Sequence, residues 1–75
     1  MQWEQVVAGN LRRLRKERGL TQEQLALEAG VAVRYIGMIE RVETSATVGM
    51  LGKLAVVLGV HPAVLLDGEG EHDRE

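Results

Sequence analysis

The sequence contains no cysteine, so a disulfide framework and a thiolate zinc site are both excluded. Its apolar runs all fall short of the ~20 residues that a helix needs to span a bilayer. The N-terminal residues Met1 to Glu4 lack the basic-then-apolar order of a secretion signal. We therefore expect a soluble cytoplasmic protein that has no membrane partner.

Groups that carry out catalysis are also scarce. Ser45 is the only serine, and no histidine lies near it in the sequence. His61 precedes Pro62 and His72 lies in an acidic stretch, and neither has a partner at metal-ligand spacing. We therefore expect a protein that is not an enzyme and that binds no metal, cofactor or small-molecule ligand.

The net charge of -2 is unevenly distributed along the 75 residues. Residues 67–75 carry a charge of -4, which leaves +2 on residues 1–66. A charge of +4 falls within seven residues, contributed by Arg12, Arg13, Arg15, Lys16 and Arg18 against Glu17. Such a positive field attracts phosphate, although a solvated helix face is the alternative interpretation.

Apolar spacing together with start and stop signals predicts five helices, over residues 3–18, 22–29, 33–41, 47–58 and 62–66. Thr21 and Gln24 have the spacing of a capping box ahead of the second helix, and Gly30 suits its end. Residues 67–75 are polar, acidic and glycine-bearing, which predicts a disordered acidic tail. The sequence thus predicts an all-α, compact five-helix bundle over residues 1–66.

The second and third helices have the spacing of a helix-turn-helix. Counted from Gln22, the small residue Ala26 is fifth, Gly30 is ninth, and the apolar anchors Ile36 and Ile39 are fifteenth and eighteenth. Two short helices joined by a tight glycine turn let the second helix enter the major groove of DNA. The pattern therefore predicts that residues 33–41 dock in the major groove.

Three segments resemble the Cro/cI-type (XRE) family of regulators: Leu14 to Ala26, Tyr35 to Arg41, and Leu54 to Val60. The resemblance covers about residues 6–68. In size, the chain is similar to the controller proteins of restriction-modification systems. It implies a fold like that of the lambda repressor. It also implies a homodimeric transcription regulator, a repressor or autoregulator, that binds a palindromic operator on double-stranded DNA.

The resemblance assigns DNA-binding roles residue by residue. It implies that Gln22 bonds a phosphate and that Tyr35 touches the DNA backbone, with Arg41 a weaker phosphate candidate beside Arg12, Arg13 and Lys53. It places Val33, Arg34 and Met38 at base edges, with Gly37 beside them.

Among the base-edge residues, only Arg34 can make a bidentate contact to guanine, which is worth about 1–3 kcal/mol of discrimination. Arg34 could instead hold phosphate or pair with Glu28. Val33 and Met38 could contact thymine methyl groups or serve as packing.

The resemblance also implies a structural ion pair between Arg15 and Glu40, which ties the first helix to the third. Two of the positions that depart from the family pattern adjoin the third helix. Ala32 stands where a capping Ser, Thr or Asn is usual, and Val42 stands where glycine usually follows the third helix.

The fourth predicted helix is apolar on all its faces, so a domain of this size cannot cover it alone. We therefore expect a homodimer formed through the fourth and fifth helices, with Val56, Val57 and Val64 exposed at the interface. The competing hypothesis is a protein-interaction module, such as an antitoxin or the anchor domain of a larger regulatory complex.

Overall fold

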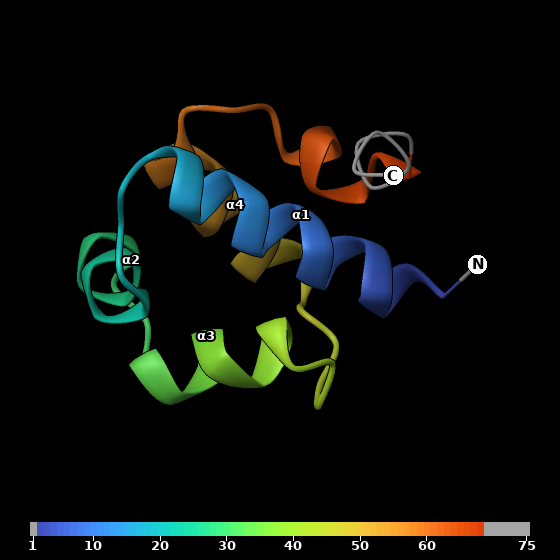
Figure 1. The fold of residues 1–75 in the computed structure, drawn as a ribbon, viewed down its shortest axis with the longest axis horizontal. Helices are drawn as coiled ribbons and strands as arrows, with labels where there is room; N and C mark the ends of the chain where they lie inside the picture. Colours follow the sequence, from blue (N-terminus) through green and yellow to red (C-terminus); the bar gives the residue numbers. More distant parts are fainter. Residues whose placement is uncertain (1, 69–75) are drawn as a thin grey trace.

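The computed structural model describes residues 2–68 and is built of helices (Figure 1). The α-helices are α1 (Trp3–Glu17), α2 (Gln22–Ala29), α3 (Val33–Glu40) and α4 (Val48–Leu58). The fifth predicted helix is a 3-10 turn, η1 (Pro62–Leu66), so the described residues form four α-helices and one 3-10 turn, and the predicted count of five helices is not confirmed. η1 contains only five residues, Pro62 included, and short helical pieces often adopt the tighter 3-10 geometry.

One apolar core holds the helices together. α1 packs on α3 and η1, α2 packs on α3 and α4, and α4 also packs on η1. The largest fully buried apolar side chains come from all five elements: Val6, Leu11, Leu25, Ile36, Ile39, Leu54, Leu58 and Leu65. Trp3, which shares the apolar spacing of α1, is nevertheless more than half exposed. The core therefore fixes α3 through Ile36 and Ile39 and leaves its opposite face free.

Asn10 is a fully buried polar residue in the middle of α1. Its Nδ2 donates to the carbonyl oxygens of Val64 at 3.2 Å, Leu65 at 3.0 Å and Asp67 at 3.1 Å. A buried amide needs such partners because an unpaired one costs about 1–3 kcal/mol. Asn10 therefore clamps η1 and the residue after it onto α1, a role that the sequence analysis missed.

All four α-helices end in the same hydrogen-bond pattern, in which two amides of the following residues close back on the last turn. The pattern needs a residue with positive φ, and three helices use glycine: Gly19, Gly30 and Gly59. At the end of α3 the residue is Val42, at φ 61°. A β-branched residue in this region is strained, so the departure found in the sequence is also a backbone irregularity.

α4 begins after Thr47, whose side-chain oxygen accepts from the amide of Met50 at 3.0 Å, so Thr47 is the cap rather than the first helical residue. The expectation that the domain cannot cover α4 is confirmed, since Val48 is 85% exposed and Val56 is 80% exposed. None of the helices in the described part of the chain is long and apolar enough to cross a membrane.

The predicted acidic tail lies outside the described residues from residue 69 onward. Its first residue, Asp67, has an exposed side chain, while its carbonyl oxygen accepts from Asn10. The boundary between domain and tail at residues 66 and 67 stays a prediction.

Candidate nucleic-acid interface

The start of α2 and the turn that follows it have the predicted local structure. The Thr21 hydroxyl oxygen accepts from the Gln24 amide at 3.0 Å, and the Gln24 side chain accepts from the Thr21 amide at 2.8 Å. Gly30 closes the helix at φ 73°, in the left-handed region where glycine carries no Cβ penalty. These features set α2 and α3 as two short helices joined by residues 30–32, which confirms the predicted helix-turn-helix geometry.

α3 lies along one edge of the molecule, on the side away from η1 (Figure 1). Ile36 and Ile39 are buried, whereas Val33 and Arg34 are exposed, and Tyr35 and Met38 are half-buried. Ala32 gives α3 no side-chain cap, as expected from the sequence. The structure therefore gathers four of the predicted DNA-binding residues, Val33, Arg34, Tyr35 and Met38, on the solvent side of one helix.

Arg34 makes no hydrogen bond or ion pair with any residue that the structure describes. The alternative pairing with Glu28 is therefore not formed. Ala32, Arg34, Tyr35 and Met38 line an open hollow on the outer face of α3. An arginine with five free N–H donors at the edge of such a hollow is available for an external partner.

Gly37, which is expected beside the base-reading residues, is buried, and its role at the DNA stays a prediction. It is buried because the Arg41 guanidinium lies across it: a Cβ at Gly37 would be 2.8 Å from Arg41 Nη1. Arg41 in turn donates from Nε and Nη2 to the Glu43 carboxylate at 3.0 and 3.1 Å. This exposed pair raises the pKa of Arg41 and lowers the pKa of Glu43 through their mutual hydrogen bonds.

Glu43, the counter-ion of Arg41, was not predicted from the sequence. The only signal was its position two residues after Arg41, next to the expected end of α3. The backbone at the end of α3 brings Glu43 close to Arg41, because the Glu43 amide donates to the Met38 carbonyl at 2.8 Å and so folds Glu43 back toward α3.

The predicted ion pair between Arg15 and Glu40 is present in the structure. Arg15 Nε and Nη2 donate to the two carboxylate oxygens of Glu40 at 2.7 and 3.1 Å. The Glu40 side chain is only 4% exposed. Burial by itself raises the pKa of Glu40, but hydrogen bonds from Arg15 and Gln22 outweigh it and hold the pKa below its ordinary value.

Gln22, the predicted phosphate contact, is the third member of this network. Its Nε2 donates to Glu40 Oε1 at 3.0 Å, which was not foreseen from the sequence. An amide nitrogen carries two hydrogens, so one N–H remains free after this bond. Glu40 therefore fixes the orientation of the Gln22 amide at the start of α2.

Most of the arginines in the positive segment of α1 are engaged with other parts of the fold. Arg12 donates to the Glu40 carbonyl at 3.0 Å, and Arg18 donates to the Leu58 carbonyl at 3.2 Å. These contacts satisfy carbonyls in the last turns of α3 and α4, where a positive charge is favourable. Arg13 pairs with Glu17 at 3.4 Å on the exposed side.

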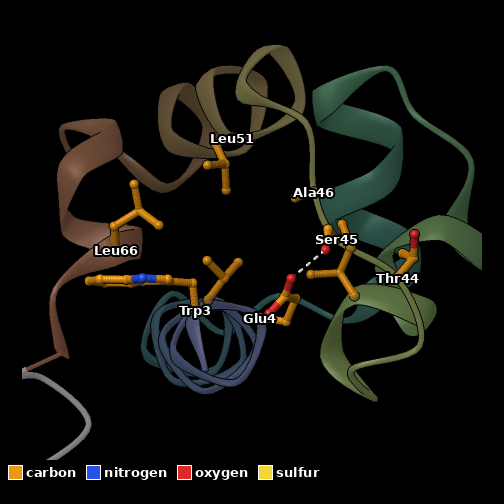
Figure 2. A pocket seen from close by; sticks show the side chains of 9 residues that line it. Trp3, Glu4, Thr44, Ser45, Ala46, Leu51 and Leu66 are labelled. Atoms are coloured by element: carbon orange, nitrogen blue, oxygen red, sulfur yellow. Dashed lines mark hydrogen bonds between the residues drawn. The ribbon is translucent and has the colours of Figure 1, made fainter. Parts of the chain in front are cut away.

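A second hollow, of about 130 Å³, lies between the start of α1, the loop after α3, and the end of η1. Figure 2 shows Trp3 and Leu66 on one side, Leu51 above them, and Glu4 and Ser45 on the other side. The Ser45 hydroxyl donates to Glu4 at 2.7 Å, and this bond lowers the pKa of Glu4. The sole serine is thus used in a structural contact.

The expected dimer residues differ in their exposure. Val56 is almost fully exposed, whereas Val57 and Val64 are half-buried and pack against the core of their own chain. The expectation that all three are exposed was therefore wrong for Val57 and Val64. No cluster of three or more metal-ligating side chains occurs among residues 2–68.

Residues 11–65 match the helix-turn-helix family HTH_3. The chain belongs to this helix-turn-helix family. The resemblance to XRE-type regulators is thereby confirmed, as is the all-helical, repressor-like fold. The match covers α2, α3 and α4 completely, together with the second half of α1 and most of η1.

Known members share most of this helix-turn-helix domain. The uncharacterized HTH-type transcriptional regulator y4dJ of Sinorhizobium fredii is 40% identical over 60 residues, which are 80% of this chain and 78% of that protein. The HTH-type transcriptional regulator SinR of Bacillus subtilis is 36% identical over 71 residues, 93% of this chain. The chain spans 64% of the length of SinR.

Two solved structures place the helix-turn-helix domain among known folds. The restriction-modification controller protein C.AhdI from Aeromonas hydrophila is 34% identical with a TM-score of 0.80, over 83% of this chain and 94% of that one. The biofilm regulator SinR in complex with DNA is 37% identical with a TM-score of 0.77, over 81% of this chain and 98% of that one.

Proposed function

We propose that this protein is a sequence-specific DNA-binding regulator, a repressor or autoregulator, that docks α3 in the major groove of a palindromic operator as a homodimer. The observation that carries the proposal is the exposed Arg34, which has no partner among residues 2–68, on an α3 whose other face is anchored by Ile36 and Ile39. The major groove, ~12 Å wide, admits one α-helix. The likeness to SinR solved with DNA supports the same use of the motif.

Within this proposal the residues have separate tasks. Arg34 reads guanine through its paired donors, while the free N–H of Gln22 and the hydroxyl of Tyr35 contact the DNA backbone. Arg41 reaches phosphate when it leaves Glu43. Val33 and Met38 supply the apolar part of the surface, and Gly37 gives room for Arg41 rather than touching a base.

Selection of binding sites from random DNA tests the function directly. We expect enrichment of a palindrome whose half-sites lie ~34 Å apart, about one helical turn. Arg34→Ala should relax one position of each half-site, whereas Gln22→Ala should weaken binding to all sequences alike. Recovery of no enriched sequence at low salt would contradict the proposal.

The homodimer is proposed through α4, where Val56 and Val48 are exposed and where Gly49 and Gly52 allow a close approach of a second helix. Val57 and Val64 contribute only their exposed parts. Sedimentation at tens of micromolar should show a dimer, and Val56→Glu should shift it to monomer. Leu27→Glu, which changes an equally exposed residue on α2, is the matched control.

The exposed side chains of α4 are also consistent with the alternative function, a protein-interaction module, and the dependence of binding on salt distinguishes the two. Binding to DNA through several phosphates weakens steeply as salt rises, because bound counterions are released. An apolar contact through α4 does not respond in this way. A monomer at all concentrations, with or without DNA, would overturn the homodimer.

A further inference from the structure

The hollow beside Trp3 is formed by residues that lie far apart in the sequence (Figure 2). It has a volume of about 130 Å³ and lies between the start of α1, the loop after α3, the first half of α4 and the end of η1. An apolar cavity of about 150 Å³ holds a molecule the size of benzene, so this space suits a ligand of roughly six non-hydrogen atoms. Because several segments form the hollow, it was not predictable from the sequence.

One wall of this hollow is apolar and incompletely covered. Figure 2 shows Trp3 and Leu66 together on one side, with Leu51 above them. Trp3 is 57% exposed and Leu66 is 41% exposed, so apolar surface remains in contact with water there. Water molecules against such a wall have few polar partners, and their displacement by an apolar group favours binding. This wall therefore suits the hydrocarbon part of a ligand.

The opposite wall is polar and negative. The Ser45 hydroxyl donates to Glu4 Oε2 at 2.7 Å, and this bond lowers the pKa of Glu4, so the carboxylate is charged at neutral pH. The remaining lone pairs of the carboxylate can accept hydrogen bonds from a ligand. Glu4 is the only charged residue among the described residues that line the hollow. This wall therefore favours a positively charged head group and disfavours an anion.

The donors at the hollow suit an organic cation better than a metal ion. Ca²⁺ takes about six to eight oxygen ligands, and Mg²⁺ requires an octahedral set. The hollow offers a single carboxylate, and its other side is hydrocarbon. An ammonium group on a short alkyl chain matches both walls, because its N–H groups donate to a carboxylate while its carbon atoms contact apolar side chains.

We propose that this hollow binds a small primary alkylammonium ion, with the ammonium group on the Glu4 carboxylate and the alkyl chain against Trp3 and Leu66. The proposal departs from the expectation that the chain has no small-molecule ligand. None of the residues assigned to DNA contact or to the dimer lines the hollow. The inference therefore does not depend on the proposed function.

The fluorescence of Trp3, the only tryptophan of the chain, reports occupancy of the hollow. Titration of the unaltered protein with n-butylammonium chloride should change the emission with a dissociation constant of about 1–10 mM, as expected for so small a ligand. Sodium chloride at the same concentrations is the control for ionic strength. 1-Butanol, which has the same chain without the charge, should bind about fivefold to tenfold more weakly. Butyrate, which has the opposite charge, should not bind measurably.

A protein variant assigns the charge preference to Glu4. Glu4→Gln keeps the size of the side chain and removes its charge, so it should weaken n-butylammonium about fivefold to tenfold and leave 1-butanol unchanged. A general loss of structure would weaken both ligands. Glu28→Gln, the same change at an exposed position of α2, is the matched control and should alter neither affinity.

Three outcomes would overturn the proposal. An emission that does not saturate with n-butylammonium excludes a site of this size. Equal affinities for n-butylammonium and 1-butanol in the unaltered protein, where folding is not in question, exclude the role of the carboxylate. An emission that shifts with protein concentration in the absence of ligand would place a second copy of the chain, and not a small cation, in the hollow.

Discussion

Replacing Asn10 by alanine removes the clamp between α1 and η1. The lost amide shares its two hydrogens among three carbonyl oxygens, and each neutral hydrogen bond contributes about 1 kcal/mol net. Because the site is fully buried, the carbonyls are left without their donor, so we expect a loss of about 2–4 kcal/mol in the free energy of unfolding. A 75-residue domain has about 4–11 kcal/mol in total, so the variant should be only marginally folded.

The isosteric change Asn10→Asp provides a sharper version of the test. It keeps the shape of the side chain but sets a carboxylate oxygen where the Nδ2 donor faced three carbonyls. A carboxylate in this place has no hydrogen to donate to the carbonyls, so Asn10→Asp should also destabilise the folded protein near neutral pH. The Arg13 guanidinium, which donates to Asn10 Oδ1 at 3.4 Å, would still contact the new carboxylate.

Urea unfolding followed by far-UV circular dichroism measures both variants. With a denaturant slope of about 1 kcal/mol per molar, Asn10→Ala should lower the midpoint by about 2–4 M. Trp3 lines the hollow beside Leu66 at the end of η1, so its fluorescence reports this end of the molecule separately. Gln5→Ala, an amide removed from the exposed face of α1, is the control. A midpoint shift no larger in Asn10→Ala than in Gln5→Ala would refute the clamp.

Three further changes have definite expected results. Glu40→Gln leaves the Arg15 charge without its partner and should lower the free energy of unfolding by about 3 kcal/mol near neutral pH, measured in urea. The folded pKa of Glu40 is lowered, so the stability that the Glu40 carboxylate contributes is present above the unfolded pKa and is lost as pH falls. The difference in stability between the variant and the unaltered protein should therefore become smaller in acid. Val42→Gly relieves a positive φ that costs about 1–2 kcal/mol, partly offset by unfolded-chain entropy of about 0.4–1 kcal/mol, so the melting temperature should rise. Glu43→Gln frees Arg41 and should tighten DNA binding severalfold for all sequences, and a titration with Arg41→Ala in the background should show a much smaller gain.

Local signals predicted the parts of the fold that depend on neighbours in the sequence. The capping box of Thr21 and Gln24 and the left-handed Gly30 were both correct, because such contacts span only a few residues. The ion pair of Arg15 with Glu40 was correct because the family resemblance supplied a contact that the spacing alone could not. These features were enough to place α2 and α3 and hence the exposed face of α3.

Two kinds of feature were not predictable in this way: contacts between residues far apart in the sequence, and the conformation of long side chains. Asn10 sits on the buried side of α1, yet its three acceptors lie more than 50 residues later in the sequence. Gly37 was expected to be exposed because helical spacing does not show that the long Arg41 side chain lies across it. Val57 and Val64 were expected to be exposed because an apolar pattern does not distinguish residues that pack on a chain's own core from residues that face solvent.

The arginines of α1 that close the ends of α3 and α4 also affect how fast a polyanion is captured. Arg12 and Arg18 bind backbone carbonyls, which are dipoles and not anions, so each arginine keeps its full charge while it holds the fold. The positive field of these two arginines therefore persists in the folded protein and steers a charged partner during diffusion. Loss of either arginine would slow association in an ionic-strength-dependent way, even if that arginine never touches the partner.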